Sequence, residues 1–444
     1  MTGPLSELAS EAYVFGFPLV FNGEQILRLT TTGIGSLPPA SFNSFSHARS
    51  LADPRDTFVS INNDTVYSIA PVDLSVGPIL LSVPDAGDRY YVLQFVDAWT
   101  NNFAYVGTRA TGNGRGDFLL VPPEWEGGPE GDGVTVIRFP TRIATIVGRW
   151  ACDGEEDLAA VEELQNSLAL TPIRTSLTPP QGMPVVAGGL GEALDFFERF
   201  RTWAIAFPPA ERDRAALDSY SVLGLTSAYT LAEAPEEVRQ ALEAGYAAGK
   251  QALEMAVRTG DGPVVNNWQV NLHIFDYNID FFEVGALDDP AWKHTDAKTR
   301  YATRAAAALG GLWGNHGYEA AYFFTYLDAA GDALTGEHTY TLRLHPTPPV
   351  RAFWSITMYD LPNFYLVENE AARYSIGDRT QGIVYDDDGG LTITMSTTRP
   401  TDPTAAANWL PTPQGAFRPI MRLYAPEQVL LDGGYEVPAI ERVD

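Results

Sequence analysis

Cysteine and histidine are both scarce in this chain, and their scarcity removes several kinds of site. A single cysteine, Cys152, cannot form an intramolecular disulfide or, by itself, a cysteine-based metal site, and we expect it to be a small buried hydrophobic residue. The six histidines never take the spacing His-Glu-x-x-His or another close metal spacing. The sequence therefore argues against a zinc hydrolase, and we expect no metal and no cofactor.

Long apolar runs and positive charge are also in short supply. No uncharged apolar segment reaches 18 residues, and the opening MTGPLSELASEAY lacks a basic stretch followed by an apolar run, so we expect a cytoplasmic protein. Lys and Arg number 29 against 56 Asp and Glu, which gives a formal net charge of −27. This charge repels phosphate backbones and anionic lipids, so neither nucleic acid nor membrane is an expected partner. An acidic or high-salt host explains the same balance, and the charge says little about the substrate.

The common nucleotide and nucleophile motifs are missing as well. No Gly-x-Ser-x-Gly elbow, phosphate loop or dinucleotide fingerprint stands between a predicted strand and a predicted helix. This argues against a serine hydrolase, a kinase and a Rossmann dehydrogenase. Carboxylate-based chemistry or plain ligand binding remains.

What the chain does have is enough length and apolar character for two packed units, with 444 residues of which 45% are apolar. Residues 6–29 show near-helical apolar spacing, and Pro18 is expected to split them into two short helices. Aromatic and β-branched runs between turn signals then predict antiparallel strands. These lie at residues 66–72, 79–83, 90–98, 117–121, 134–139 and 144–150.

Residues 155–310 are predicted to be mostly helical, because their apolar residues recur at helical spacing after Asp, Pro or Gly signals. The expected helices lie at 155–169, 190–206, 211–223, 236–259 and 296–309, with 264–270 and 274–276 as alternative short strands. Strand signals return at 322–327, 338–344, 352–359, 382–385, 391–396 and 417–424. The predicted fold class is α+β, with two antiparallel β-sandwich or jelly-roll-like domains, 1–150 and 316–444, joined by a mostly helical segment, 151–315.

A weak internal repeat links the two predicted β domains. The strands at 66–72, 79–83 and 90–98, the last ending at Asp97, are matched in order by 322–327, 339–344 and 353–359, followed by Asp360. Duplication of one unit explains the match, and so does chance similarity between aromatic strands. Both explanations stay open at the level of sequence.

Several short motifs support a resemblance to a known family. The amino-terminal ones are Glu11-Ala12-Tyr13, Asn62-Asn63-Asp64-Thr65, Val83-Pro84-Asp85, Arg89-Tyr90-Tyr91-Val92-Leu93-Gln94 and Asp97-Ala98-Trp99-Thr100-Asn101. The carboxy-terminal ones are Ala352-Phe353-Trp354-Ser355, Thr357-Met358-Tyr359-Asp360, Arg373-Tyr374-Ser375-Ile376-Gly377-Asp378-Arg379, Asn408-Trp409-Leu410-Pro411, Arg422-Leu423-Tyr424 and Pro438-Ala439-Ile440-Glu441-Arg442-Val443. With them the chain resembles bacterial proteins that combine domain of unknown function 1254 with domain of unknown function 1214.

This resemblance implies paired β-sandwich or jelly-roll domains, similar to the two-domain architecture of peptide-N-glycosidase F, which works with carboxylates near its domain interface. That is an analogy of fold and does not give the function. The chain departs from the family at Trp313-Gly314-Asn315-His316, where relatives often have a Gly-Ala-Asn-Pro-like stretch, and near Met395-Ser396, where they have a Gln-His pair.

Asp97 is a candidate catalytic residue. Strand alternation places it on the same face as Tyr91, Leu93 and Phe95. A carboxylate in apolar company has a raised pKa and can act as a general acid or base. Alternatively, Asp97 ends the strand and caps a turn through Thr100 or Asn101.

Two further clusters carry candidate binding residues. Asn62, Asn63 and Asp64 offer donors and acceptors in one short loop, which suits a polyol or amide ligand and equally suits an Asx turn. Arg373 and Arg379 flank an acid, so either guanidinium could fork onto a substrate carboxylate, or the pair could clamp a loop through Asp378.

Two functions of different class follow. The first is a metal-independent hydrolase or lyase in which the catalytic acid/base is Asp97 or Asp64. The second is a non-catalytic small-ligand-binding protein with a cleft between the β domains. In both, the partner is a small polar or aromatic molecule, a homo-oligomer is left open, and the expected binding residues are Asn62, Asn63, Tyr67, Gln94, Trp99, Asn101, Trp354, Asp360, Arg373 and Arg379.

Overall fold

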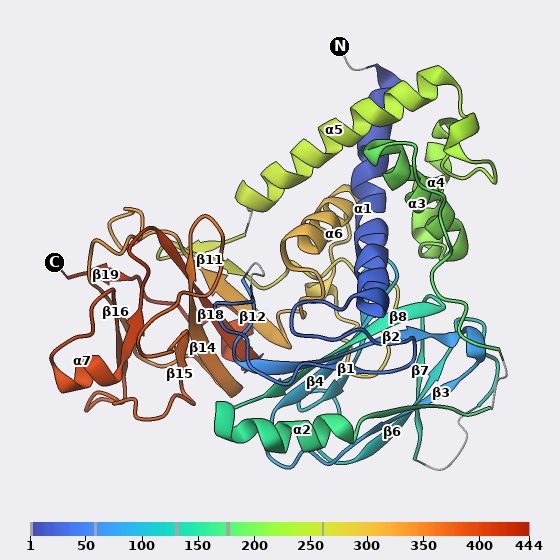
Figure 1. Ribbon diagram of the computed structural model, residues 1–444. Helices are drawn as coiled ribbons and strands as arrows, with labels where there is room; N and C mark the ends of the chain where they lie inside the picture. Colours follow the sequence, from blue (N-terminus) through green and yellow to red (C-terminus); the bar gives the residue numbers. More distant parts are fainter. Residues whose placement is uncertain (1–2, 57–59, 129–132, 175–177, 260–261, 444) are drawn as a thin grey trace.

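Figure 1 shows the computed structural model of the chain, which describes residues 3–56, 60–128, 133–174, 178–259 and 262–443. It is a mixed α+β structure with four sheets in the described part of the chain. The long helices gather above the amino-terminal strands, and the carboxy-terminal strands form a separate body beside them (Figure 1). No helix in these ranges is long and apolar enough to span a membrane.

The helices are α1 Pro4–Thr31, α2 Leu158–Asn166, α3 Glu192–Ala206, α4 Arg214–Ser219, α5 Glu236–Thr259, α6 Ala297–Gly311, α7 Pro403–Ala407 and α8 Gln428–Leu431. The strands of the first half are β1 Ser46–His47, β2 Thr65–Asp73, β3 Ile79–Val83, β4 Tyr91–Asp97, β5 Asn102–Gly107, β6 Gly116–Val121, β7 Thr135–Arg138, β8 Ile143–Ala151 and β9 Ala169–Pro172. Those of the second half are β10 Val264–Val265, β11 Trp268–Asn271, β12 Ala320–Phe324, β13 Tyr340–Leu344, β14 Val350–Asp360, β15 Ser375–Gly377, β16 Leu391–Ser396, β17 Trp409–Pro411, β18 Phe417–Pro426 and β19 Glu441–Arg442.

Helix α1 is continuous, so the expectation that Pro18 splits it is wrong. It begins at Pro4, before the expected cap, because the fixed φ of proline suits the first helical turn. Pro18 lies in the most buried stretch of the helix, between Phe17 and Leu19. Packing on α3, α5 and α6 outweighs the backbone hydrogen bond that proline removes.

The two halves have the same strand order apart from one additional edge strand, β10, in the second half. The amino-terminal sheets run β1-β2-β8-β4-β5 and β7-β6-β3-β9, and the carboxy-terminal ones run β10-β11-β12-β18-β14-β15 and β17-β16-β13-β19. Even the two parallel pairs correspond, since β6 pairs with β7 as β16 pairs with β17. The repeat suggested by the sequence is therefore present in the topology of both halves, and chance similarity of two aromatic strands does not account for it.

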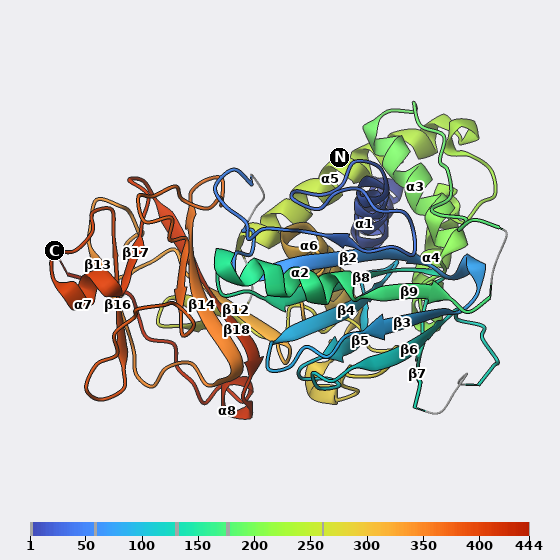
Figure 2. The same cartoon turned by 60° about the horizontal axis from the view of Figure 1, so that its bottom comes forward.

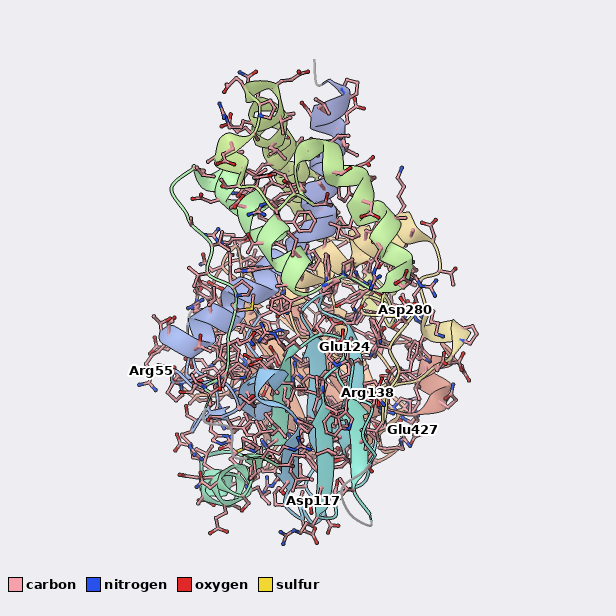
Figure 3. All side chains as sticks on the ribbon, turned by 90° about the vertical axis from the view of Figure 1, so that its right-hand side faces the viewer. Arg55, Asp117, Glu124, Arg138, Asp280 and Glu427 are labelled. Carbon is pink, nitrogen blue, oxygen red and sulfur yellow. The ribbon has the colours of Figure 1, made fainter. Side chains whose placement is uncertain are left out.

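Each pair of sheets shares apolar side chains. In the first half, Leu93 and Phe95 of β4 belong to one buried cluster with Leu81 of β3 and Leu120 of β6. Strand β9 extends this sheet system past the expected boundary at residue 150. Charged side chains such as Glu124 and Arg138 lie on its outside (Figure 3).

The predicted strand at 382–385 is absent, and one side chain explains why. Asn408 is fully buried, and its Nδ2 donates to the Val384 carbonyl at 2.7 Å while its Oδ1 accepts from the Val384 amide at 2.8 Å. These bonds replace a strand neighbour, so the backbone is satisfied without a ladder. Residues 274–276 likewise form no strand and belong to a turn.

We expect Asn408→Ala to lower the free energy of unfolding by roughly 3 kcal/mol, because it leaves buried backbone groups without partners. Urea denaturation followed by tryptophan fluorescence measures the change. The control is Asn363→Ala, which removes one exposed hydrogen bond to Asp360 and should cost below roughly 1 kcal/mol. Equal losses in the two variants would contradict the assignment.

Candidate functional site between the two β parts

The outer face of the β2-β8-β4 sheet packs against the β12-β18-β14 sheet. Tyr90 and Val92 from the first half belong to the same buried cluster as Phe353 and Tyr424 from the second half. The Tyr90 ring meets the Tyr424 ring at a centroid distance of 5.6 Å. Figure 2 shows the strands of the two halves meeting along this boundary.

Equivalent positions of the two halves place the same residue types at this boundary. Tyr67 of β2 lies opposite Arg149 of β8, and Tyr322 of β12 lies opposite Arg422 of β18. Both arginines are buried, while both tyrosines are only partly buried. We call the surrounding set of residues the interdomain polar layer. It consists of Asn62, Asp64, Tyr67, Gln94, Arg149, Asn315, Tyr322, Ser355, Arg422 and Tyr424.

Arg149 is held by neutral acceptors. Its Nη1 donates to Gln94 Oε1 at 2.8 Å and to Asn315 Oδ1 at 3.4 Å, and its Nη2 donates to the Trp313 carbonyl at 2.6 Å. Its guanidinium lies 5.4 Å from the centroid of the Tyr67 ring. Among the described residues no carboxylate forms an ion pair with it, although it is only 5% exposed.

Arg422 has a similar environment on the other side of the layer. Its Nη1 donates to Thr357 Oγ1 and its Nη2 to the Ser60 carbonyl, each at 2.9 Å. It too has no ion pair within the described ranges, although Asp64 is near enough to raise its pKa. Tyr322 interacts electrostatically with both guanidiniums. The two halves therefore bring their arginines to a common group of tyrosines.

Asp64 is the carboxylate of the layer. Its Oδ2 accepts from Ser355 Oγ at 2.6 Å and from the Tyr424 hydroxyl at 3.2 Å. Asn62 bonds to both Asp64 and Tyr424, because its Oδ1 accepts from the Asp64 amide and its Nδ2 donates to the Tyr424 hydroxyl at 2.7 Å. This carboxylate, two hydroxyls and an amide form a connected network that could hold or move a proton.

Asn63 and Arg379 connect the two halves beside this network. Asn63 Oδ1 accepts from Ser375 Oγ at 2.9 Å. Arg379 donates to the Asp64 carbonyl at 3.1 Å, pairs with Asp153 at 2.8 Å and lies 3.5 Å from the centroid of the Phe353 ring. Through these contacts the side chains of Asn63 and Arg379 hold the two halves together.

A second buried network borders the layer. The Tyr105 and Tyr318 hydroxyls lie 2.9 and 3.0 Å from His316 Nδ1, and burial lowers the pKa of this imidazole to about 3. Glu319 pairs with Arg109 and accepts from the Tyr90 hydroxyl. This network is charge-balanced, with one acid for its one guanidinium.

Asp97 lies at the far end of the sheet from Asp64. It is opposite Ala144 of β8, whereas Thr65, the neighbour of Asp64, is opposite Ala151. Seven residues of strand separate these positions, about 23 Å at 3.3 Å per residue. The two candidate catalytic carboxylates therefore do not meet in one site.

Asp97 caps a turn, as one of the two interpretations of the sequence predicted. Its Oδ1 accepts from the Trp99 and Asn101 amides at 2.9 and 2.8 Å, and its Oδ2 accepts from Asn101 Nδ2 at 2.9 Å. Burial nevertheless raises the pKa of this carboxyl to about 6. Arg304 donates to Asn101 Oδ1 and lies 3.8 Å from Asp213, which closes a buried structural network beneath the helices.

The other predicted binding residues are dispersed. The Trp99 indole is buried beneath the helices and donates to the Phe207 carbonyl, and Trp354 lies in the carboxy-terminal core. Asp360 caps a turn by accepting from the Tyr365 amide. Arg373 donates to the carbonyls of residues 407 and 409, so the loop clamp it forms does not use Asp378.

Two surface grooves lie outside the layer. The larger, of 570 Å³, is lined by Ser36, Pro38, Pro39, Phe45, Ser46, His47, Arg49 and Ser50. The smaller, of 280 Å³, borders Glu368, Glu370 and Trp409. Neither contains a residue of the layer. No group of three or more His, Cys, Asp or Glu in the described ranges is placed to hold a metal ion.

Sequence reasoning missed the arginines of the layer, although a signal was available. Arg149 is the single charged residue of the buried strand β8, and Arg422 lies in the middle of β18, which also carries Arg418 near its start. Aligning the two repeats by strand register would have placed them at the same position, each opposite a tyrosine. Asn315 was noticed only as part of a departure from the family pattern, and it forms part of this site.

Two family models match the chain. One, described as a protein of unknown function (DUF1254), covers residues 42–172, and the other, described as a protein of unknown function (DUF1214), covers residues 319–428. No curated protein matches. The crystal structure of the VPA0106 protein from Vibrio parahaemolyticus is similar, with a TM-score of 0.72 and 24% identity over 99% of this chain and 100% of that one. A protein from Burkholderia cenocepacia has a TM-score of 0.43 and 13% identity over 96% and 88% of the two chains. The first likeness concerns the fold alone.

The buried Asp97 generates a pH prediction. Its pKa is about 6 in the folded protein and ordinarily 3.8, so the folded state takes up its proton first as the pH falls. Lowering the pH from 7.5 to 4.5 should therefore raise the free energy of unfolding of wild type relative to Asp97→Asn, by on the order of 2 kcal/mol. Denaturant titrations at several pH values measure this difference. The exposed Asp88→Asn is the control, and a pH-independent difference for Asp97→Asn would contradict the prediction.

Proposed function

Because the chain belongs to the proteins that combine domain of unknown function 1254 with domain of unknown function 1214, and neither domain carries an assigned activity, we propose a function from the site itself: the interdomain polar layer binds a small polar or aromatic molecule. Shared fold does not define a reaction, so the chemistry of the residues has to support the proposal. The ligand contacts would come from both β halves, as expected of binding sites at domain boundaries.

The observation that carries the proposal is the group of unsatisfied or neutral-partnered polar groups within a buried interface. Buried guanidiniums are ordinarily paired, and buried amides are ordinarily bonded. Here Arg149 has neutral partners only, and Asn315 Nδ2 and Thr65 Oγ1 have no partner in the described structure. Tyr67 and Tyr322 are partly exposed, so solvent reaches the edge of the layer. A ligand with hydrogen-bond acceptors of its own would supply the partners that these polar groups lack.

A second candidate function is acid/base catalysis of the hydrolase or lyase class by Asp64. It is favoured by the geometry of Asp64, whose carboxylate is hydrogen-bonded to Ser355 and Tyr424 within the layer. A proton could pass between the carboxyl and the Tyr424 hydroxyl without a metal ion. In this mechanism Asp97 acts only through the fold, since its oxygens are taken up by the turn that it caps.

The proposal also covers the arrangement of the sheets, the cellular location and the partner. We propose that the two sheets of each half form a sandwich of jelly-roll type, which is supported by the apolar cluster shared between β3, β4 and β6. A cytoplasmic location and a small molecule as the partner, with neither nucleic acid nor membrane, agree with the formal charge of −27. A homo-oligomer is left open.

Incubation of the purified protein with a library of glycosides, amides, esters and aromatic natural products tests the proposal. Untargeted mass spectrometry identifies both retained compounds and products. We expect wild type to retain at least one compound, and Tyr67→Phe to weaken its binding about tenfold by removing one hydroxyl. Asp64→Asn should keep the binding and abolish any product, because an amide cannot serve as the acid or base.

Asp97→Asn is the matched control, since it makes the same chemical change at the far end of the sheet. Loss of product in Asp97→Asn but not in Asp64→Asn would contradict the second candidate. Equal retention of every compound by wild type and Tyr67→Phe, or no retention by wild type, would overturn the binding site itself.

A further inference from the structure

We propose that the ligand group recognised in the interdomain polar layer is a carboxylate, bound between the Tyr67–Arg149 and Tyr322–Arg422 pairs of the two repeats. The inference rests on the proposed binding function and adds the chemical class of the ligand. It follows from the charge balance of the layer, from an unpartnered buried donor within it, and from the internal repeat.

The two arginines of the layer differ in their ion pairing from the other buried arginines of the described structure. Five arginines are buried there. Arg201 pairs with Glu198, and Arg300 and Arg304 both pair with Asp213. Arg149 and Arg422 have no ion pair in the described ranges. A buried guanidinium without an anion costs several kcal/mol, so an anion from outside the chain would stabilise both.

The balance also selects the charge of that anion. Arg149 and Arg422 contribute two positive charges, and Asp64 contributes one negative charge beside the Tyr424 hydroxyl. One further negative charge makes the layer neutral. A dianion such as phosphate would bring a second charge close to the Asp64 carboxylate, so a monocarboxylate fits the layer better.

The donors of the layer suit carboxylate oxygens. Guanidinium groups bind carboxylates through parallel N–H groups, and a carboxylate accepts further bonds from amides and phenols. Asn315 is fully buried, its Oδ1 accepts from Arg149 at 3.4 Å, and its Nδ2 has no partner. This unpartnered donor next to a guanidinium without an anion indicates an acceptor that the chain does not supply.

The internal repeat explains how two arginines come to share one ligand. In each half the arginine is on the strand between the equivalents of β2 and β4, opposite a tyrosine. Tyr322 and Tyr424 interact electrostatically with the guanidiniums of the layer, Tyr322 with both of them. Packing the same face of two similar sheets together therefore places the two pairs on opposite sides of one site.

The test uses sodium benzoate as the probe, benzamide as its neutral isostere and inorganic phosphate as the alternative anion. Isothermal titration calorimetry at constant ionic strength measures the affinities for the full-length protein. We expect wild type to bind benzoate at least about tenfold more tightly than benzamide or phosphate. This preference would reflect the charge of the carboxylate, since the rings of benzoate and benzamide are alike.

Asn315→Asp is the informative variant. It preserves the shape of the side chain and loses no hydrogen bond, because Nδ2 has no partner, and it places a carboxylate beside Arg149. We expect its thermal midpoint to rise and its benzoate affinity to fall at least about tenfold. Asn166→Asp on α2 adds the same charge at an exposed position and should bind benzoate like wild type. If circular dichroism shows Asn315→Asp to be unfolded, Arg149→Gln replaces it with the same expected loss of affinity.

Several results would overturn the inference. Benzamide bound as tightly as benzoate would reject the carboxylate and leave the binding function intact, provided that Tyr67→Phe still weakens both. Tighter binding of phosphate, no benzoate binding by wild type, or unchanged benzoate affinity in Asn315→Asp would also reject it. Failure of the library experiment, by contrast, would remove the binding function on which the inference rests.

Discussion

The contact between the two β halves depends on the hydrogen bonds of one short loop. Residues 60–64 precede β2, and their backbone and side chains bond to strands β14, β15 and β18 of the other half. Asp64 bonds to Ser355, the Ile61 carbonyl accepts from Tyr359, and the Ser60 carbonyl accepts from Arg422. Without these bonds the polar faces of the two sheets would lie against each other unsatisfied, at a cost that apolar packing alone would not offset.

This constraint explains why the two candidate carboxylates, Asp64 and Asp97, have different hydrogen-bond partners. Asp64 is on the loop that joins the halves and therefore faces groups from both. Asp97 has a raised pKa, a common property of catalytic carboxylates, but its oxygens are bonded to its own turn. A shifted pKa reports burial, and only the geometry around the group distinguishes a reactive carboxylate from a structural one.

Much of the fold could be predicted from the sequence because its signals are local. The strands at 79–83 and 391–396 were placed correctly, since turn residues bound each apolar run, and helix 236–259 agrees with its amphipathic pattern. Pro18 and the segment 382–385 were interpreted wrongly, because packing around α1 and the side chain of Asn408 act from distant parts of the chain. Tertiary contacts of this kind override local propensity.

The site was harder to predict than the fold. Of the predicted site residues, Asn62, Asp64, Tyr67 and Gln94 lie at the boundary between the halves, whereas Trp354, Asp360 and Arg373 lie elsewhere. An arginine in a strand is ordinarily expected at the surface, and its place as the single charged residue of β8 is a weak sign that Arg149 is buried. Its burial follows from the packing of one sheet on another, which only the register of the repeats reveals.

The shared strand order gives the chain the character of a homodimer built within a single polypeptide. A true homodimer must carry every substitution twice, because both subunits come from one sequence. Here the copies are free to differ: Val92 and Gln94 occupy the positions of Ser355 and Thr357, and Asp64 occupies the position of Glu319. Within one chain the interface is therefore asymmetric: both halves supply a guanidinium and a carboxylate, but Asp64 bonds to Ser355 and Tyr424, whereas Glu319 bonds to Arg109 and Tyr90.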